Sequence, residues 1–173
     1  TEGKVSVTDV IGADEKRILQ KAEALEQLSS HPLSKAICEA AARKEVQTQA
    51  GIQDFQNFSG KGLSGTDADG NRILAGNTLL MKENGISTDR FQSDIAKLQS
   101  EGKTVILIAE NGILLGLIAA ADTVKPDAKE AIDALKTMGI HTVLLTGDNQ
   151  AAAQTIGKEV GVDEIIAEVL PTE

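Results

Sequence analysis

The chain has 173 residues, of which 41% are apolar and 25% charged, as expected for one globular domain or two small ones. A formal net charge of −9 and the absence of Tyr and Trp exclude a basic surface for a nucleic-acid backbone and aromatic platforms for single-stranded bases. The single cysteine, Cys38, excludes a disulfide framework, and no metal site is expected within the chain. No apolar stretch has the length of a membrane span.

The first predicted elements are one strand and two helices. Residues 5–11 alternate between apolar and polar side chains, as a strand does. After Asp14, a residue suited to a helix N-cap, apolar residues recur at helical spacing as far as Leu28. Pro32 predicts the start of a second helix, because proline fits the first helical position.

The middle of the chain indicates an antiparallel sheet with helices. Ala68-Asp69-Gly70-Asn71 is a hairpin signal between two short apolar segments. Two helices and two strongly apolar strands are expected to follow. The expected bounds are 63–66 and 73–75 for the hairpin strands, 78–84 and 88–100 for the helices, and 104–109 and 113–121 for the later strands.

Residues 125–161 read as helix, strand and helix, with the strand at 142–146, which is typical of a parallel sheet. We therefore expect two regions of different class, α+β and α/β. Residues 14–114 form an antiparallel sheet with flanking helices. Residues 115–173, joined by 1–13, form part of a doubly wound parallel α/β domain that is incomplete.

Thr146-Gly147-Asp148 directly follows a predicted parallel strand. At such a strand end, loop N–H groups and the next helix N-terminus meet a ligand. Thr146 offers a hydroxyl to a phosphoryl oxygen, Gly147 allows close backbone approach, and Asp148 can orient water or Mg²⁺. The alternative is that Gly147 only makes a turn and Asp148 only caps the next helix.

Asp122 and Lys125 lie at the exit of another apolar strand. Spaced three residues apart, they can bracket a nucleotide or a phosphate. They are equally compatible with a solvated turn that Pro126 closes.

Glu26 and His31 stand on either side of a predicted helix junction. Because His31 precedes a proline, its backbone conformation is restricted. Its imidazole can stack on, or hydrogen-bond to, a flat heterocycle, and Glu26 can bond ring nitrogens or orient the histidine. The alternative is that the His-Pro pair only starts a helix.

Glycines mark the ends of several strand-like segments. Gly60, Gly62 and Gly76 permit close approach of the backbone to a ligand. Asn77 can cap the following helix or contact a sugar. Glycines of hairpins and bulges give the same pattern, so a structural role is the alternative.

Taken together, in this order and at these spacings, these segments closely resemble the cytoplasmic loop of heavy-metal-transporting P-type ATPases, and the likeness covers essentially the whole chain. Glu-x4-His-Pro-Leu, Gly-x-Gly and Gly-Asn are similar to that family's nucleotide-binding domain. Thr-Gly-Asp-Asn and Ala-Glu-Val-Leu-Pro are similar to its haloacid-dehalogenase-like phosphorylation domain. The resemblance implies an adenine and ribose site for ATP at Glu26, His31, Gly60, Gly62, Gly76 and Asn77. It also implies that Thr146, Gly147 and Asp148 face the phosphoryl group and Mg²⁺, with Asp122 and Lys125 near the domain interface.

The family phosphorylates an aspartate in an Asp-Lys-Thr-Gly-Thr motif, and these residues contain no such motif. We therefore expect the chain to begin beyond the nucleophile and to bind ATP without turnover in isolation, as a monomer. In the intact pump, ATP hydrolysis would drive cation transport at the cytoplasmic face of a membrane, with the transmembrane and actuator domains of the same polypeptide as partners. The Asp-Thr-Val-Lys-Pro and Ala-Glu-Val-Leu-Pro segments favour export of Cu⁺.

Two other functions fit the residues. One is a free-standing phosphatase of the haloacid-dehalogenase type with Asp122 as nucleophile. Against it, the position of the general acid, two residues later, holds Val124, which cannot transfer a proton. The other is a non-catalytic interaction module in which all the glycines are structural.

Overall fold

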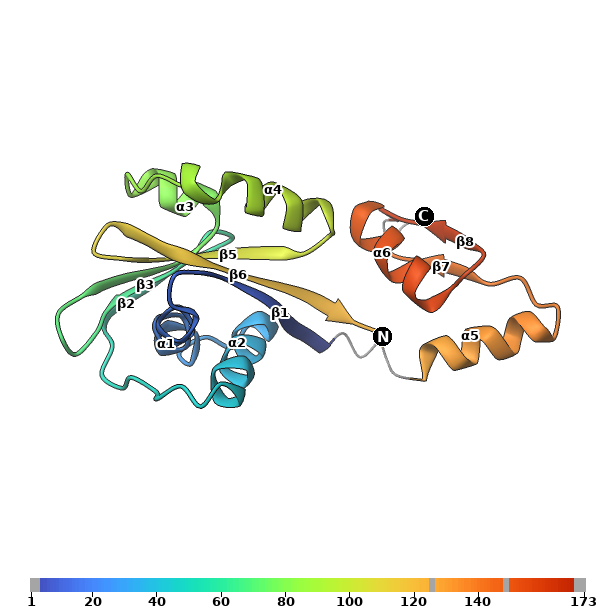
Figure 1. Ribbon diagram of the computed structural model, residues 1–173, viewed down its shortest axis with the longest axis horizontal. Helices are drawn as coiled ribbons and strands as arrows, with labels where there is room; N and C mark the ends of the chain where they lie inside the picture. The colour runs from blue at the N-terminus through green and yellow to red at the C-terminus, as the bar shows by residue number, and fades with distance from the viewer. Residues whose placement is uncertain (1–3, 125–126, 148–149, 170–173) are drawn as a thin grey trace.

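The computed structural model describes residues 4–124, 127–147 and 150–169, which form a larger and a smaller part (Figure 1). The strands of the larger part are β1 (Lys4–Gly12), β2 (Gln53–Phe58), β3 (Gly62–Thr66), β4 (Arg72–Gly76), β5 (Thr104–Glu110) and β6 (Ile113–Thr123). Its helices are α1 (Glu15–Glu26), α2 (Pro32–Arg43), α3 (Thr78–Glu83), the short 3-10 helix η1 (Asp89–Phe91) and α4 (Gln92–Ser100). The smaller part contains α5 (Ala128–Thr137), β7 (Val143–Leu145), α6 (Gln150–Val160) and β8 (Glu164–Ile166).

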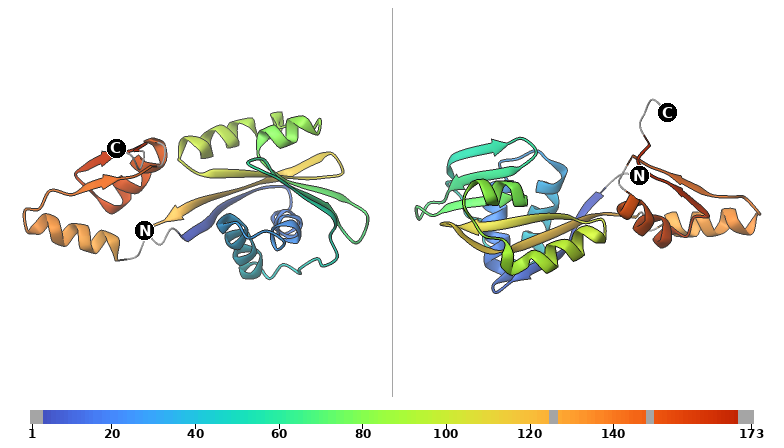
Figure 2. Two further views of the ribbon diagram at one scale, coloured as in Figure 1. Left: turned by 180° about the vertical axis from the view of Figure 1, so that it is seen from behind. Right: turned by 90° about the horizontal axis from the view of Figure 1, so that it is seen from above.

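The larger part is one antiparallel sheet with the strand order β1-β6-β5-β4-β3-β2. Helices α1 and α2 cover one face, and α3 and α4 cover the other (Figure 1). In the smaller part, β7 and β8 pair in parallel. Seen from behind and from above, this part lies at one end of the six-stranded sheet (Figure 2). The predicted combination of an antiparallel sheet with flanking helices and a parallel α/β part is confirmed.

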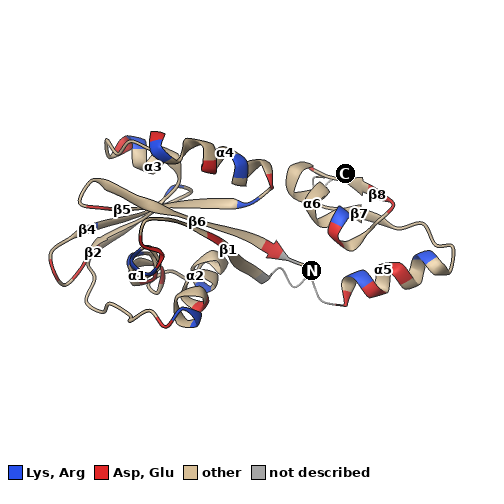
Figure 3. Cartoon of the chain, in the orientation of Figure 1, with Lys and Arg blue, Asp and Glu red and all other residues tan. Residues whose placement is uncertain are grey.

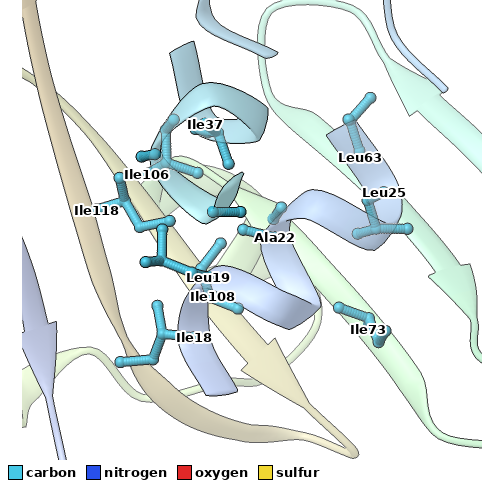
Figure 4. Close-up of a cluster of buried hydrophobic side chains, with 13 residues drawn as sticks. Ile18, Leu19, Ala22, Leu25, Ile37, Leu63, Ile73, Ile106, Ile108 and Ile118 are labelled. Carbon is cyan, nitrogen blue, oxygen red and sulfur yellow. The ribbon is translucent and has the colours of Figure 1, made fainter. Parts of the chain in front are cut away.

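The continuous apolar runs of β5 and β6 follow from burial on both faces. Alternate residues of a strand point to opposite faces, so a strand covered on both sides must be apolar throughout. Ile106, Ile108 and Ile118 pack against α1 and α2 (Figure 4), while Leu107 and Leu117 pack against α3 and α4. The two layers of the core therefore share these central strands.

The six-stranded sheet extends past both expected domain boundaries. β1 pairs with β6 from Lys4 opposite Thr123 to Gly12 opposite Gly116, so residues 4–12 and 113–123 lie in the sheet of the first region. The boundary expected after residue 114 would fall inside β6. The apolar run of residues 113–121 already indicates one continuous strand there. The assignment of the two regions to a nucleotide-binding and a phosphorylation domain stays a prediction.

A buried ion cluster, made of Lys21, Asp67 and Glu110 with the half-exposed Arg17 at its edge, joins α1 to two strand ends. Lys21 is 4% exposed, and its ammonium lies 2.6 Å from Oδ2 of Asp67 and 2.8 Å from Oε1 of Glu110. Arg17 pairs with the other oxygen of Glu110. Burial acts to lower the pKa of Lys21, but the two carboxylates outweigh it, so the pKa of Lys21 is raised and the charge is retained.

Asp67 also fixes the β3–β4 hairpin that the sequence indicates. Its Oδ1 accepts hydrogen bonds from the backbone N–H groups of Asp69 at 3.0 Å and Asn71 at 2.8 Å. Burial acts to raise the pKa of Asp67, but hydrogen bonds from Lys21 and Asn71 lower this pKa to about 2. One carboxylate therefore sets both the turn and the position of α1 against it.

The smaller part buries much less of its surface. Helix α5 buries none of its residues and carries charges of both signs along its length (Figure 3). Several large apolar side chains of this part are exposed, although parallel strands are usually covered on both faces. They are Met138 at 73%, Leu145 at 63%, Val143 at 46%, Ile140 at 44% and Ile166 at 42%. Across the described residues, none of the helices combines the length and apolar character that crossing a bilayer requires.

Candidate functional site

One cavity of about 310 Å³ is lined by all six residues expected around a purine and a ribose. We call it the junction cavity, because it lies where the α1–α2 junction meets the β2–β3 turn and the end of β4. Strand β5 completes its wall with residues 104–106. The six residues are Glu26, His31, Gly60, Gly62, Gly76 and Asn77.

His31 is the N-cap of α2, with an extended backbone at φ −68° and ψ 142°. This conformation is the one expected before Pro32. Its Nδ1 accepts a hydrogen bond from the N–H of Leu33 at 3.2 Å, so Nδ1 carries no proton in this arrangement. In the neutral ring the hydrogen is therefore on Nε2. The junction cavity is thus lined by an imidazole that can donate through Nε2–H.

Glu26 ends α1 and is 7% exposed, although it lines the junction cavity. The hydroxyl of Ser34, in the first turn of α2, donates a short hydrogen bond to its Oε2. Burial raises the pKa of Glu26, while the hydrogen bond from Ser34, and His31 whenever its ring is protonated, act in the opposite direction. A buried carboxylate at a cavity wall is a strong acceptor for an N–H or O–H group of a ligand.

The packing of the strands requires two of the glycines of the junction cavity, Gly62 and Gly76. Gly62 and Gly76 face each other across the β3–β4 pair. A Cβ on Gly62 would lie 2.2 Å from the carbonyl oxygen of Ala75, and a Cβ on Gly76 would lie 2.4 Å from that of Lys61. The structural alternative therefore accounts for these two residues. The same packing leaves bare backbone on this wall of the cavity.

We expect Gly62→Ala to lower the free energy of unfolding by about 2–3 kcal/mol, because the methyl group meets rigid backbone and φ is +144°. Gly60→Ala is the matched control. Gly60 has φ +71° but open space around a Cβ, so the expected loss is only about 1 kcal/mol. Urea unfolding of both variants measures the difference, and equal losses would contradict the steric argument.

Asn77 has a structural role in addition to any ligand contact. Its Oδ1 caps α3 by accepting from the N–H of Leu80 at 3.0 Å, and its Nδ2 donates to the carbonyl of Gly60 at 2.9 Å. The N–H of Asn77 also donates to the carbonyl of Lys61 at 2.8 Å. Asn77 therefore ties the β2–β3 turn to α3, and both of its side-chain groups already have partners.

The sequence did not indicate three further residues of this wall: Ser34, Phe58 and Thr104. Ser34 could have been found from the sequence, because it lies three residues after His31, in the first turn of the predicted helix. Phe58 is two residues before Gly60 at the end of β2, where an aromatic side chain reads as core. Thr104 comes from β5, whose approach to the cavity depends on strand order alone.

The residues expected near a phosphoryl group lie elsewhere. Asp122 lines a larger cavity of about 490 Å³ between the end of the six-stranded sheet and α6, together with Val124 and Thr155. Thr146 and Gly147 directly follow β7; the backbone N–H of Thr146 donates to Ile166 at 3.0 Å, and its carbonyl accepts from Val169 at 3.1 Å. Two other expected residues, Lys125 and Asp148, lie outside the described residues.

The junction cavity combines a carboxylate acceptor, an imidazole N–H donor and a glycine-lined backbone wall. This set can recognise a flat heterocycle by its edge and admit it close to the main chain. In the larger cavity, Asp122 is exposed. The residue two positions after it is Val124, which cannot donate a proton.

Comparisons with known proteins match nearly the whole chain. A family model described as haloacid dehalogenase-like hydrolase matches residues 1–172. The chain is 45% identical to a probable copper-importing P-type ATPase A of Enterococcus hirae, with 100% of this chain and 24% of that protein covered. It is 39% identical to a copper-exporting P-type ATPase of Vibrio cholerae, with 100% and 19% covered.

Among solved structures, the crystal structure of a zinc-transporting PIB-type ATPase in the E2.Pi state matches with a TM-score of 0.87 and 35% identity. That match covers 99% of this chain and 28% of the pump. The chain thus spans about a fifth to a quarter of the length of the two curated relatives. The resemblance to heavy-metal-transporting P-type ATPases that the sequence predicts is confirmed, and the chain belongs to the haloacid dehalogenase-like hydrolases.

Proposed function

We propose that the junction cavity binds ATP as part of a heavy-metal-transporting P-type ATPase. The observation that carries this proposal is that six residues scattered from position 26 to position 77 line one cavity. Its volume of about 310 Å³ is in the range of small-molecule sites. The relatives named as P-type ATPases support ATP as the nucleotide.

The groups around the cavity suit an adenine ring. The carboxylate of Glu26 accepts from an amino group of the ring, and Nε2–H of His31 donates to a ring nitrogen or to an oxygen of the nucleotide. Gly60, Gly62 and Gly76 let the ring or the ribose lie close to the backbone. In this proposal Asn77 contributes mainly by holding Gly60 in place, since its amide already bonds to that residue.

The phosphoryl end of the reaction is proposed for the strand ends of the smaller part. Thr146, Gly147 and Asp148 would hold the phosphoryl group and Mg²⁺, with Asp122 and Lys125 near the interface of the two parts. Mg²⁺ would supply charge neutralisation during phosphoryl transfer. The hydroxyl of Thr146 and the backbone at Gly147 fit a phosphoryl oxygen, because donors at the end of a parallel strand favour anions.

In the intact pump, an aspartate outside these 173 residues would receive the phosphoryl group from ATP, and the transmembrane and actuator domains would couple this step to transport. The fragment would then lie at the cytoplasmic face of the membrane. Movement of the two parts toward each other would bring the phosphate chain of ATP to that aspartate.

We propose Cu⁺ as the transported ion and export as the direction. The Vibrio cholerae relative, named as a copper exporter, supports both. The Enterococcus hirae relative supports copper but is named as an importer, and the matched solved structure is of a zinc transporter. Transport of copper against zinc by vesicles that contain the whole pump would separate these possibilities.

The proposal is tested by titrating the chain with ATP and with a non-hydrolysable analogue while recording amide NMR spectra. We expect the largest shift changes at the six residues of the junction cavity, equal responses to both nucleotides, and no release of phosphate. Amides of α5 serve as the internal reference. The absence of any shift change around His31 would instead favour a non-catalytic interaction module.

The rival phosphatase has its own test. Its nucleophile would be Asp122, so Mg²⁺-dependent hydrolysis of p-nitrophenyl phosphate that disappears in Asp122→Asn would favour it over ATP binding at the junction cavity. We expect no such activity, because Val124 stands where the general acid would be needed.

A further inference from the structure

The hydrogen bond between Ser34 and Glu26 joins the end of α1 to the first turn of α2. Ser34 is 2% exposed and Glu26 7%, yet both side chains line the junction cavity. The hydroxyl of Ser34 donates to Oε2 of Glu26. Within the described part of the chain, this is the one hydrogen bond that the Glu26 carboxylate accepts. Its Oε1 is therefore the oxygen left for a ligand.

We infer that Ser34 is a positioning residue of the proposed nucleotide site, which holds Glu26 so that Oε1 is presented to an amino group of the purine. A carboxylate with one oxygen fixed cannot rotate without breaking that bond, so its second oxygen points in a set direction. The inference rests on the proposed function, because it needs a ligand donor in the cavity. It adds a residue that the helix-junction motif itself does not indicate.

The same bond controls the charge of Glu26. Burial raises the pKa of this carboxyl, and the Ser34 hydroxyl opposes that rise. Loss of the hydroxyl would therefore raise the pKa of Glu26 further, and the carboxyl would become protonated at a higher pH. A protonated carboxyl has an O–H donor where the ligand needs an acceptor.

Elements that pack near Glu26 carry other titratable side chains. His31 favours the ionised carboxylate whenever its ring is protonated. Burial, together with Glu23 and Glu26, raises the pKa of the Cys38 thiol on the facing helix. Lys61 lines the same cavity, but its ammonium lies 2.7 Å from Oε1 of Glu83. None of these groups changes when only the Ser34 hydroxyl is removed.

The first experiment measures ATP affinity of the parent chain and of Ser34→Ala by calorimetry over a series of pH values. We expect affinity to fall in acid for both proteins, with the fall in Ser34→Ala beginning at higher pH. At neutral pH the variant should bind about three- to tenfold more weakly, the net effect of about one ordinary hydrogen bond. Ser34→Thr retains the hydroxyl and should restore the parent pH profile.

Two further variants separate positioning from a general structural effect. Ser87→Ala is the matched control, because it also removes a serine-to-carboxylate hydrogen bond, from Ser87 to Asp89 at 2.9 Å, but outside the junction cavity. It should leave ATP affinity unchanged. In Glu26→Gln, which cannot titrate, adding Ser34→Ala should not shift the pH profile.

A second experiment needs no nucleotide. Carbon-13 NMR of the Glu26 carboxyl should give a higher pKa in Ser34→Ala than in the parent chain. An unchanged pKa, or a loss of affinity that is equal at all pH values, would overturn the inference while leaving ATP binding in place. If the parent chain binds no ATP, the proposed function fails first, and the carboxyl titration then shows whether Ser34 controls Glu26 at all.

Discussion

Replacing Asp67 with Ala is expected to lower the free energy of unfolding by about 3–5 kcal/mol, the cost of removing one partner from a buried ion pair. The ammonium of Lys21 would stay buried with one carboxylate instead of two, and the β3–β4 turn would lose the acceptor of its backbone N–H groups. Urea unfolding followed by circular dichroism measures the loss.

Asp69→Ala is the matched control, since it removes an exposed carboxylate from the same turn. We expect a change within about 0.5 kcal/mol for it. Equal effects of the two substitutions would contradict the role given to the buried ion cluster.

The low pKa of Asp67 also predicts how stability depends on pH. Because this pKa is depressed from its usual value of 3.8 to about 2 in the folded state, its contribution to stability is present above about pH 4 and is lost as the pH falls toward 2. The parent chain should therefore lose stability over that interval. In Asp67→Ala this part of the loss should be missing, and the acid limb should be shallower.

His31→Gln is expected to weaken ATP binding about tenfold, because the imidazole that lines the junction cavity is removed. The chain should remain folded. The change also removes the ring that caps α2, which should cost about 1 kcal/mol of stability. Calorimetry gives the affinity, and thermal unfolding shows whether one cooperative transition is retained.

The other histidine of the chain provides the control. His141→Gln makes the same substitution in the smaller part, where the side chain is 66% exposed and lies 3.4 Å from Glu164. It should leave ATP affinity unchanged. Equal affinities of the His31 variant and the parent chain would remove the support for a purine at the helix junction.

The sequence predicted the elements of the fold well where the signal is local. The hairpin at Ala68–Asn71, the helix start at Pro32 and the apolar strands on either side of residue 111 all appear in the structure. Turn residues, helix caps and the alternation of side chains act within a few positions, so they can be read directly. The helix expected over 88–100 is divided into η1 and α4, a local adjustment near its start.

Local signals of this kind could not predict that β1 pairs with β6. The two strands are about a hundred residues apart in the chain, and their alternation is compatible with more than one sheet. The buried ion cluster was hidden for a similar reason. Lys21 and Asp67 read as ordinary surface charges, and only the packing of α1 against the β3–β4 hairpin removes both from water.

The sequence by itself determined the types of element, the turn at Ala68–Asn71 and the set of residues that resemble a nucleotide site. The tertiary structure decided that Glu26, His31, Gly60, Gly62, Gly76 and Asn77 share one cavity, and that Ser34 contacts the first of them. The reason is that hydrogen bonds of turns and caps link neighbours in the chain, whereas a cavity wall depends on which distant strands and helices pack together.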